Sequence, residues 1–230
     1  MVTDREPMVS GDDYFANHAR ARRFPWTLYH QPLERDLGRF LQLVAREHPG
    51  GDVLVVGCGL LHELDLAPDG LRFRVVDVDE RAVAAVLARR DPRILGGAVV
   101  SPEEPLDQAL AREGSGGAGW ARPVAIYAKE VVEHVRAWPA WLVGLRRALA
   151  PGGRLWLSTP NYGEPWLPAL EATVLELIAR RSGFSRRHLH PSRFTRRSLE
   201  RGLLAAGFQD LRVAPIARRL ALSAWARASS

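Results

Sequence analysis

The chain has 230 residues, of which 47% are hydrophobic, and this is enough for one large α/β domain with a sizeable core. It has no apolar run of about 18 residues, so we expect no membrane span, and its N-terminal stretch lacks the apolar core of a signal peptide. Cys58 is the only cysteine, which excludes an internal disulfide and favours a soluble protein of the reducing cytoplasm.

The formal charge is +6, although Lys129 is the only lysine. Arginines become denser toward the C-terminal end, where they include Arg180, Arg181, Arg186 and Arg187. Such a cluster can bind phosphates, but it is also typical of a solvated helix face in an arginine-rich protein. Composition alone therefore does not indicate a nucleic-acid partner.

The hydrophobic pattern alternates between strands and helices along the chain. After an aromatic- and arginine-rich opening that Pro25 and Pro32 divide, we expect an N-terminal segment, 1–32, and a domain, 33–230. Helices are predicted over 33–48, 80–90, 138–149, 164–181 and 195–206, and strands over 53–56, 73–78, 93–100, 123–128, 154–158, 208–213 and 219–225. A glycine-rich loop is predicted over 114–119. The alternation predicts a Rossmann-like, doubly wound, mostly parallel seven-stranded sheet with helices on both faces.

The first predicted strand ends in a glycine turn, in the sequence DVLVVGCGLLHELDL. Gly57 and Gly59 let the backbone turn sharply and approach a ligand, and the ligands of such sheets bind at the carboxyl ends of the strands. About 20 residues on, the second strand ends in Asp77, whose carboxylate suits the two hydroxyls of a ribose. Asp79 fits better as the cap of the following helix.

Five motifs occur in an order that resembles the class I S-adenosylmethionine-dependent methyltransferases: VLVVGCG, VVDVDERAV, EVVEHV, LRRALAPGGRLWLSTPNY and FTRRSLERGLLAAGF. The resemblance covers about residues 52–208. It implies S-adenosylmethionine as the cofactor, with the turn Gly57-Cys58-Gly59 under its methionine part. It also implies that Asp77 binds the ribose, that Val78 lies near the adenine and that Lys129 is a further cofactor contact.

The sequence departs from the pattern of this family at several places. Val55 stands where an acidic residue is usual, and Leu61 replaces the third glycine of the turn. We expect the bulkier Leu61 side chain to crowd the carboxylate of the methionine part. These departures leave open a binding protein with a methyltransferase fold that has lost catalysis.

The segment KEVVEHV places Glu130, Glu133 and His134 at positions i, i+3 and i+4, which share one face if the segment is helical. The pattern Glu-x-x-Glu-His resembles the metal-binding motif of the ubiquinone-biosynthesis O-methyltransferases and of the small-RNA 2′-O-methyltransferases. His190, five residues before Thr195, has the spacing of a fourth ligand in the latter group. Three interpretations remain open: a divalent metal site, a metal-free general base at His134 or His190, and a structural pair.

Four aromatic residues, Trp26, Tyr29, Tyr162 and Trp166, lie in regions that commonly cover the substrate in this family. We therefore expect segment 1–32 to cover the substrate, and methyl transfer to a hydroxyl of an aromatic or lipid-like small molecule. The alternative enzyme is an RNA 2′-O-methyltransferase with a metal at the Glu-x-x-Glu-His cluster, so a nucleic-acid partner is less favoured but stays open. The sequence does not indicate an oligomeric state.

Overall fold

The fold is known from a computed structural model, which describes residues 26–101, 104–114, 120–170, 173 and 190–229. Seven strands form one sheet in the order β3-β2-β1-β4-β5-β7-β6. The strands are β1 (Asp52–Val56), β2 (Arg72–Asp77), β3 (Ile94–Val99), β4 (Ala125–Lys129), β5 (Arg154–Pro160), β6 (Phe208–Ile216) and β7 (Ala221–Ala228). β7 runs antiparallel to both of its neighbours, β5 and β6, and all other neighbouring strands are parallel. The predicted mostly parallel seven-stranded sheet is therefore confirmed.

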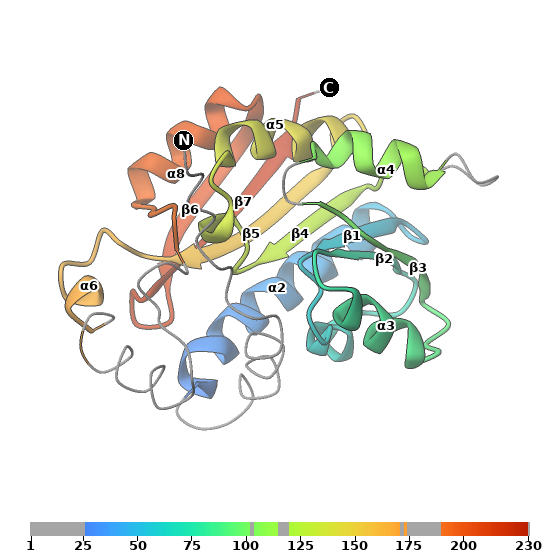
Figure 1. The fold of residues 1–230 in the computed structure, drawn as a ribbon, viewed down its shortest axis with the longest axis horizontal. Coiled ribbons are helices and arrows are strands. Elements are labelled where there is room, and N and C mark those ends of the chain that lie inside the picture. Colours follow the sequence, from blue (N-terminus) through green and yellow to red (C-terminus); the bar gives the residue numbers. More distant parts are fainter. Residues whose placement is uncertain (1–25, 102–103, 115–119, 171–172, 174–189, 230) are drawn as a thin grey trace, which may run out of the picture.

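Helices cover both faces of the sheet (Figure 1). The helices are α2 (Thr27–Glu47), α3 (Glu80–Ala88), α4 (Leu106–Gly114), α5 (Trp138–Ala148), α6 (Trp166–Leu170) and α8 (Arg196–Ala205), with 3-10 turns η1 (His62–Leu66) and η2 (Val132–His134). Apolar residues of α4, α5 and α8 form one core with one face of the sheet. Residues of α2, η1 and α3 form the second core on the other face. The central strands are buried on both sides, which is why they are almost continuously apolar.

The structure differs from the predicted elements at two places. Helix α2 begins at Thr27 and continues through Pro32, so the predicted boundary between 1–32 and 33–230 falls inside a helix. A proline inside a helix costs one hydrogen bond, and here the apolar residues that follow it are buried against the sheet and stabilise the helix. Helix α4 was not predicted. Most of the predicted helix over 164–181, and most of the glycine-rich loop 114–119, lie outside the described residues.

Within the described part of the chain, no helix is both long enough and apolar enough to cross a membrane.

A buried carboxylate fastens α2 to the sheet. Asp36 is only 8% exposed, and its Oδ2 accepts hydrogen bonds from Trp156 Nε1 at 3.0 Å, from Ser223 Oγ at 2.5 Å and from Trp225 Nε1 at 2.8 Å. Because these donors lie on β5 and β7, one side chain joins three elements that are distant in sequence. Such a network is stable only when every buried polar group has a partner.

Replacing Asp36 with alanine is expected to lower the free energy of unfolding by about 2–4 kcal/mol, because two indole N–H groups and a hydroxyl lose their acceptor. Asp36→Asn, which keeps an acceptor oxygen, is expected to cost less. Urea unfolding measures both, with Asp69→Ala at an exposed position as the control. An Asp36→Ala midpoint equal to that of the control would show that the network does not stabilise the fold.

Candidate active site

The glycine turn after β1 has the geometry that the sequence predicts. Gly57 and Gly59 have φ angles of +71° and +47°, which favour glycine. A Cβ at Gly57 would also lie 2.5 Å from Cγ2 of Val131, so the position has no room for a side chain. The N–H groups of Gly57 and Cys58 donate to the carbonyl of Val76 and hold the turn against β2.

Asp77, at the end of β2, contacts the same turn. Its Oδ2 accepts from the backbone N–H of Gly59 at 2.9 Å, and its Oδ1 accepts from the N–H of Asp79 at 3.0 Å. Asp79 caps α3 by accepting from the N–H of Arg81, as its sequence position indicated. The next residue, Val78, is 60% exposed. Asp77 and Val78, the residues predicted to contact the ribose and the adenine, therefore lie together beside the glycine turn, at the carboxyl edge of the sheet.

The side chain of Cys58 points into the core instead of toward solvent. It is 4% exposed and belongs to the core on the α2 side of the sheet. Burial, together with the neighbouring Asp77 carboxylate, raises the pKa of the thiol well above its ordinary value. A cofactor contact by Cys58 would therefore involve its backbone.

The expectation that Leu61 crowds the cofactor is wrong. Leu61 has a φ of +48°, in the left-handed region, and its side chain is 1% exposed within the core formed with α2 and α3. The left-handed backbone turns the side chain into this core. The residue thus keeps the backbone conformation that favours glycine and uses its side chain for packing.

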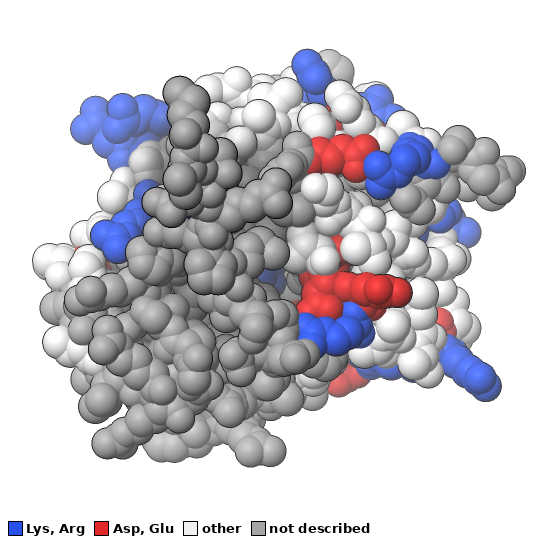
Figure 2. Space-filling model, in the orientation of Figure 1, with Lys and Arg blue, Asp and Glu red and all other residues white. Residues whose placement is uncertain are grey.

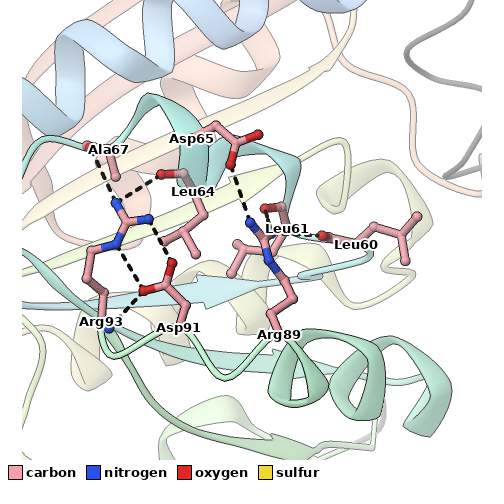
Figure 3. Close-up of polar contacts among 8 residues, drawn as sticks. All are labelled: Leu60, Leu61, Leu64, Asp65, Ala67, Arg89, Asp91 and Arg93. Carbon is pink, nitrogen blue, oxygen red and sulfur yellow. Dashed lines mark hydrogen bonds and ion pairs between the residues drawn. The ribbon is translucent and has the colours of Figure 1, made fainter.

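Two arginines hold the segment that follows the turn (Figure 3). Arg89 donates to the carbonyl of Leu61 at 2.7 Å and pairs with Asp65 at 3.3 Å. Arg93 donates to the carbonyl of Leu64 at 3.2 Å, and the Asp91 carboxylate holds its guanidinium. Residues 57–71 contain only the short turn η1, so these side chains satisfy carbonyls that a regular helix would satisfy itself.

Lys129, at the end of β4, lies in a buried ionic cluster. Its Nζ forms an ion pair with Glu63 of η1 and lies 3.5 Å from Oε1 of Glu34 of α2. Burial alone would lower the pKa of Lys129, but the two neighbouring carboxylates have the larger effect, so the pKa of Lys129 is raised. Burial alone would raise the pKa of Glu63, but the neighbouring Lys129 ammonium has the larger effect, so the pKa of Glu63 is lowered. Lys129 and Glu63 therefore form a charged pair beside the glycine turn.

Glu130 does not share a helical face with Glu133 and His134, in contrast to the expectation. Its φ is +57°, and the short turn η2 begins only at Val132. The Glu130 carboxylate instead accepts from Tyr29 Oη at 2.5 Å and from Ser158 Oγ at 2.8 Å. Burial raises its pKa, opposed by these two hydrogen bonds and by the nearby His190 and Lys129. Glu130 thus joins α2 to β5.

The other three members of the predicted cluster do come together. One ligand-type atom from each of Glu133, His134 and His190 lies within 4.8 Å of the others. The two imidazole rings are 5.1 Å apart between centroids, and Tyr162 Oη lies 2.7 Å from Nδ1 of His190. This hydrogen bond orients the ring of His190. Glu133, His134 and His190 are called the triad below.

Of the four predicted aromatic residues, Tyr29 and Tyr162 contact members of the cluster, whereas Trp166 is 44% exposed on α6. Sequence analysis did not find Ser158, Glu63 or Glu34. The only signal for Ser158 was its place at the end of a predicted strand. For Glu63 it was the place just after the glycine turn, and for Glu34 the place on an amphipathic helix. Arg180, Arg181, Arg186 and Arg187 lie outside the described residues. On the described part of the face shown in Figure 2, basic and acidic side chains are interspersed.

Several solved structures are similar to this chain at low sequence identity. The CurJ carbon methyltransferase aligns with a TM-score of 0.69 at 17% identity, over 95% of this chain and 59% of that one, so this chain spans about three fifths of its length. The N-methyltransferase NodS from Bradyrhizobium japonicum WM9, in complex with S-adenosyl-L-homocysteine, aligns with a TM-score of 0.58 at 18% identity, over 95% and 99%. The putative methyltransferase complexed with the Trm112 activator of Haloferax volcanii aligns with a TM-score of 0.62 at 14% identity, over 97% and 100%.

Among curated proteins, none matches this sequence. A family model described as a methyltransferase domain matches residues 11–213, which is most of the chain. The cofactor of such a domain is S-adenosylmethionine, in agreement with the glycine turn and Asp77. The chain therefore belongs to the methyltransferase-domain family of S-adenosylmethionine-dependent enzymes.

Proposed function

We propose that this enzyme transfers the methyl group of S-adenosylmethionine to a hydroxyl of an aromatic or lipid-like small molecule. The observation that supports an oxygen acceptor is the triad. Two of its members, Glu133 and His134, lie in η2 just after β4, so the triad is at the same edge of the sheet as the glycine turn. A hydroxyl must lose its proton during methyl transfer, and the triad gathers one carboxylate and two imidazoles that can promote this loss. Methyltransferases similar in fold include carbon and nitrogen enzymes, so the fold alone does not select the acceptor.

The cofactor would lie across the glycine turn. Each oxygen of the Asp77 carboxylate accepts one backbone N–H, and each has a second lone pair for a ribose hydroxyl. At the methionine end, Glu63 and Glu34 carry two negative charges against the one positive charge of Lys129. This excess suits the cationic sulfonium and ammonium groups, and it would replace the carboxylate that is missing at Val55.

The donor set of the triad also fits a divalent metal. Two imidazoles and a carboxylate suit Fe, Co, Mn or Zn by ligand type. If His190 held the ion through Nε2, its Nδ1–H would donate to Tyr162 Oη, and such a donated hydrogen bond is usual for metal-bound histidines. When bound, such an ion would lower the pKa of the substrate hydroxyl. Without a metal, His190, oriented by Tyr162, is the residue best placed to accept the proton. In both cases Glu130 orients its neighbours and does not react.

Asp77→Ala is expected to weaken S-adenosylhomocysteine binding by roughly 1–3 kcal/mol, because the ribose hydroxyls lose a charged acceptor and Gly59 loses its partner. Asp79→Ala is the matched control: it removes the cap of α3 and about 1 kcal/mol of stability, while the ribose contact stays. Calorimetry gives the affinities and thermal melts give the stabilities. Equal affinities of the two variants would show that Asp77 does not bind the cofactor.

The triad is tested by methyl transfer to catechols and other phenols before and after chelation. If the triad holds a metal, chelator abolishes turnover, Mn or Co restores it, and His134→Ala and His190→Ala lose similar activity because the ligands act as a unit. If His190 is a metal-free base, chelator has no effect and His190→Ala alone lowers kcat, by about 100-fold or more. His48→Ala, at the far end of α2, is the control. Full turnover in both triad variants would exclude both roles.

A further inference from the structure

The end of β4 joins the glycine turn to the triad. Val56 of β1 pairs with Ala128 of β4, so the next residue, Lys129, is level with Gly57. A Cβ at Gly57 would lie 2.5 Å from Cγ2 of Val131, which shows that the chain after β4 packs directly against the turn. Two members of the triad follow in η2. Under the proposed function, the sulfur of S-adenosylmethionine has to lie over this strand end, because its methyl group must reach an acceptor at the triad.

The ion cluster at this strand end has an excess of negative charge. Lys129 has two carboxylate partners, Glu63 and Glu34, so the cluster has one positive and two negative formal charges. The chain as a whole has a formal charge of +6. The negative charge of the cluster is therefore local, and it does not follow from the arginine-rich composition.

Water screens this cluster only weakly. The side chains of Lys129, Glu34 and Glu63 are 16%, 15% and 7% exposed. Despite burial, the Lys129 ammonium keeps the pKa of Glu63 below its ordinary value. In surroundings of low effective dielectric constant, one unit of charge changes an interaction energy much more than it does in water. A ligand atom that gains or loses a charge beside the cluster therefore changes the affinity of that ligand.

The cofactor changes its charge at one atom during the proposed reaction. Methyl transfer breaks the bond between sulfur and the methyl carbon, and the electron pair of that bond stays on sulfur. The methyl group bonds to the acceptor oxygen, which loses its proton. The sulfonium of S-adenosylmethionine is positive and the thioether of S-adenosylhomocysteine is neutral, whereas the amino-acid ends of the two molecules are the same. Negative charge beside the sulfur therefore favours the cofactor over the product.

From this charge arrangement we infer that Glu34 and Glu63 make the site selective for S-adenosylmethionine over S-adenosylhomocysteine, so that the enzyme is only weakly inhibited by its own product. The inference rests on the proposed function for the position of the sulfur over the end of β4. Glu34 is the better of the two carboxylates for a test. It lies 3.5 Å from Lys129 Nζ, whereas Glu63 forms the closer ion pair that also fastens η1 to β4.

Calorimetric titration of the unchanged protein with S-adenosylmethionine and with S-adenosylhomocysteine measures the selectivity as the ratio of two dissociation constants. We expect the cofactor to bind about ten-fold more tightly than the product. Sinefungin, in which a carbon that bears an ammonium group replaces the sulfonium, is expected to bind as the cofactor does. Equal affinities, or tighter binding of S-adenosylhomocysteine, would overturn the inference and leave the cofactor assignment intact. No binding of any of the three ligands would overturn both.

A charge-removing variant assigns the selectivity to the cluster. Glu34→Gln keeps the size of the side chain and makes the cluster neutral, so the ratio is expected to fall to within about two-fold of one, through weaker binding of S-adenosylmethionine and sinefungin. Glu47→Gln is the matched control, because Glu47 lies at the other end of α2 and pairs with Arg154, and its ratio should equal that of the unchanged protein. An unchanged ratio in a folded Glu34→Gln variant would contradict the inference. If that variant does not fold, the ratio in the unchanged protein and the affinity of sinefungin still decide.

Discussion

The chain must cross from the end of β1 to the start of the parallel strand β2 with only residues 57–71. Parallel neighbours usually need a helix for such a crossover, and here the segment contains one short 3-10 turn. The backbone groups that a helix would satisfy internally are satisfied by side chains from elsewhere: Asp77 accepts from Gly59, and Arg89 and Arg93 donate to carbonyls. The shape of the glycine turn and of the segment after it therefore depends on the end of β2 and on the residues that follow α3, and not on the glycines alone.

The alternation of apolar strands and amphipathic helices was enough to predict the parallel sheet and the edge at which the site lies, because both follow from local periodicity. Asp77 was also predictable, since its place at a strand end fixes its direction. Glu130 was not. Its left-handed backbone and its two partners, Tyr29 and Ser158, come from segments far apart in the chain. The direction of the Leu61 side chain was also predicted wrongly. It depends on a left-handed backbone angle, as at Glu130, which leucine rarely adopts.

The carboxyl edge of the sheet contains two groups of ionisable side chains with different surroundings. Lys129, Glu63 and Glu34 form an ion cluster, whereas the triad has one carboxylate for two imidazoles. Glu130 lies between them and is fastened to α2 and β5. Under the proposed function, cofactor binding and proton removal would fall to different residues. A change in one group would then alter cofactor affinity without altering the chemical step.

Lys129 carries the only side-chain amine of the chain, and its side chain is 16% exposed. Its ammonium is charged and paired with carboxylates, so it is a poor nucleophile while the site is closed. An amine-directed acylating reagent would consequently modify this side chain mainly in molecules whose α2 and η1 have separated from β4. The extent of acylation at this one position would then report how often the carboxyl end of the sheet opens, without an engineered label.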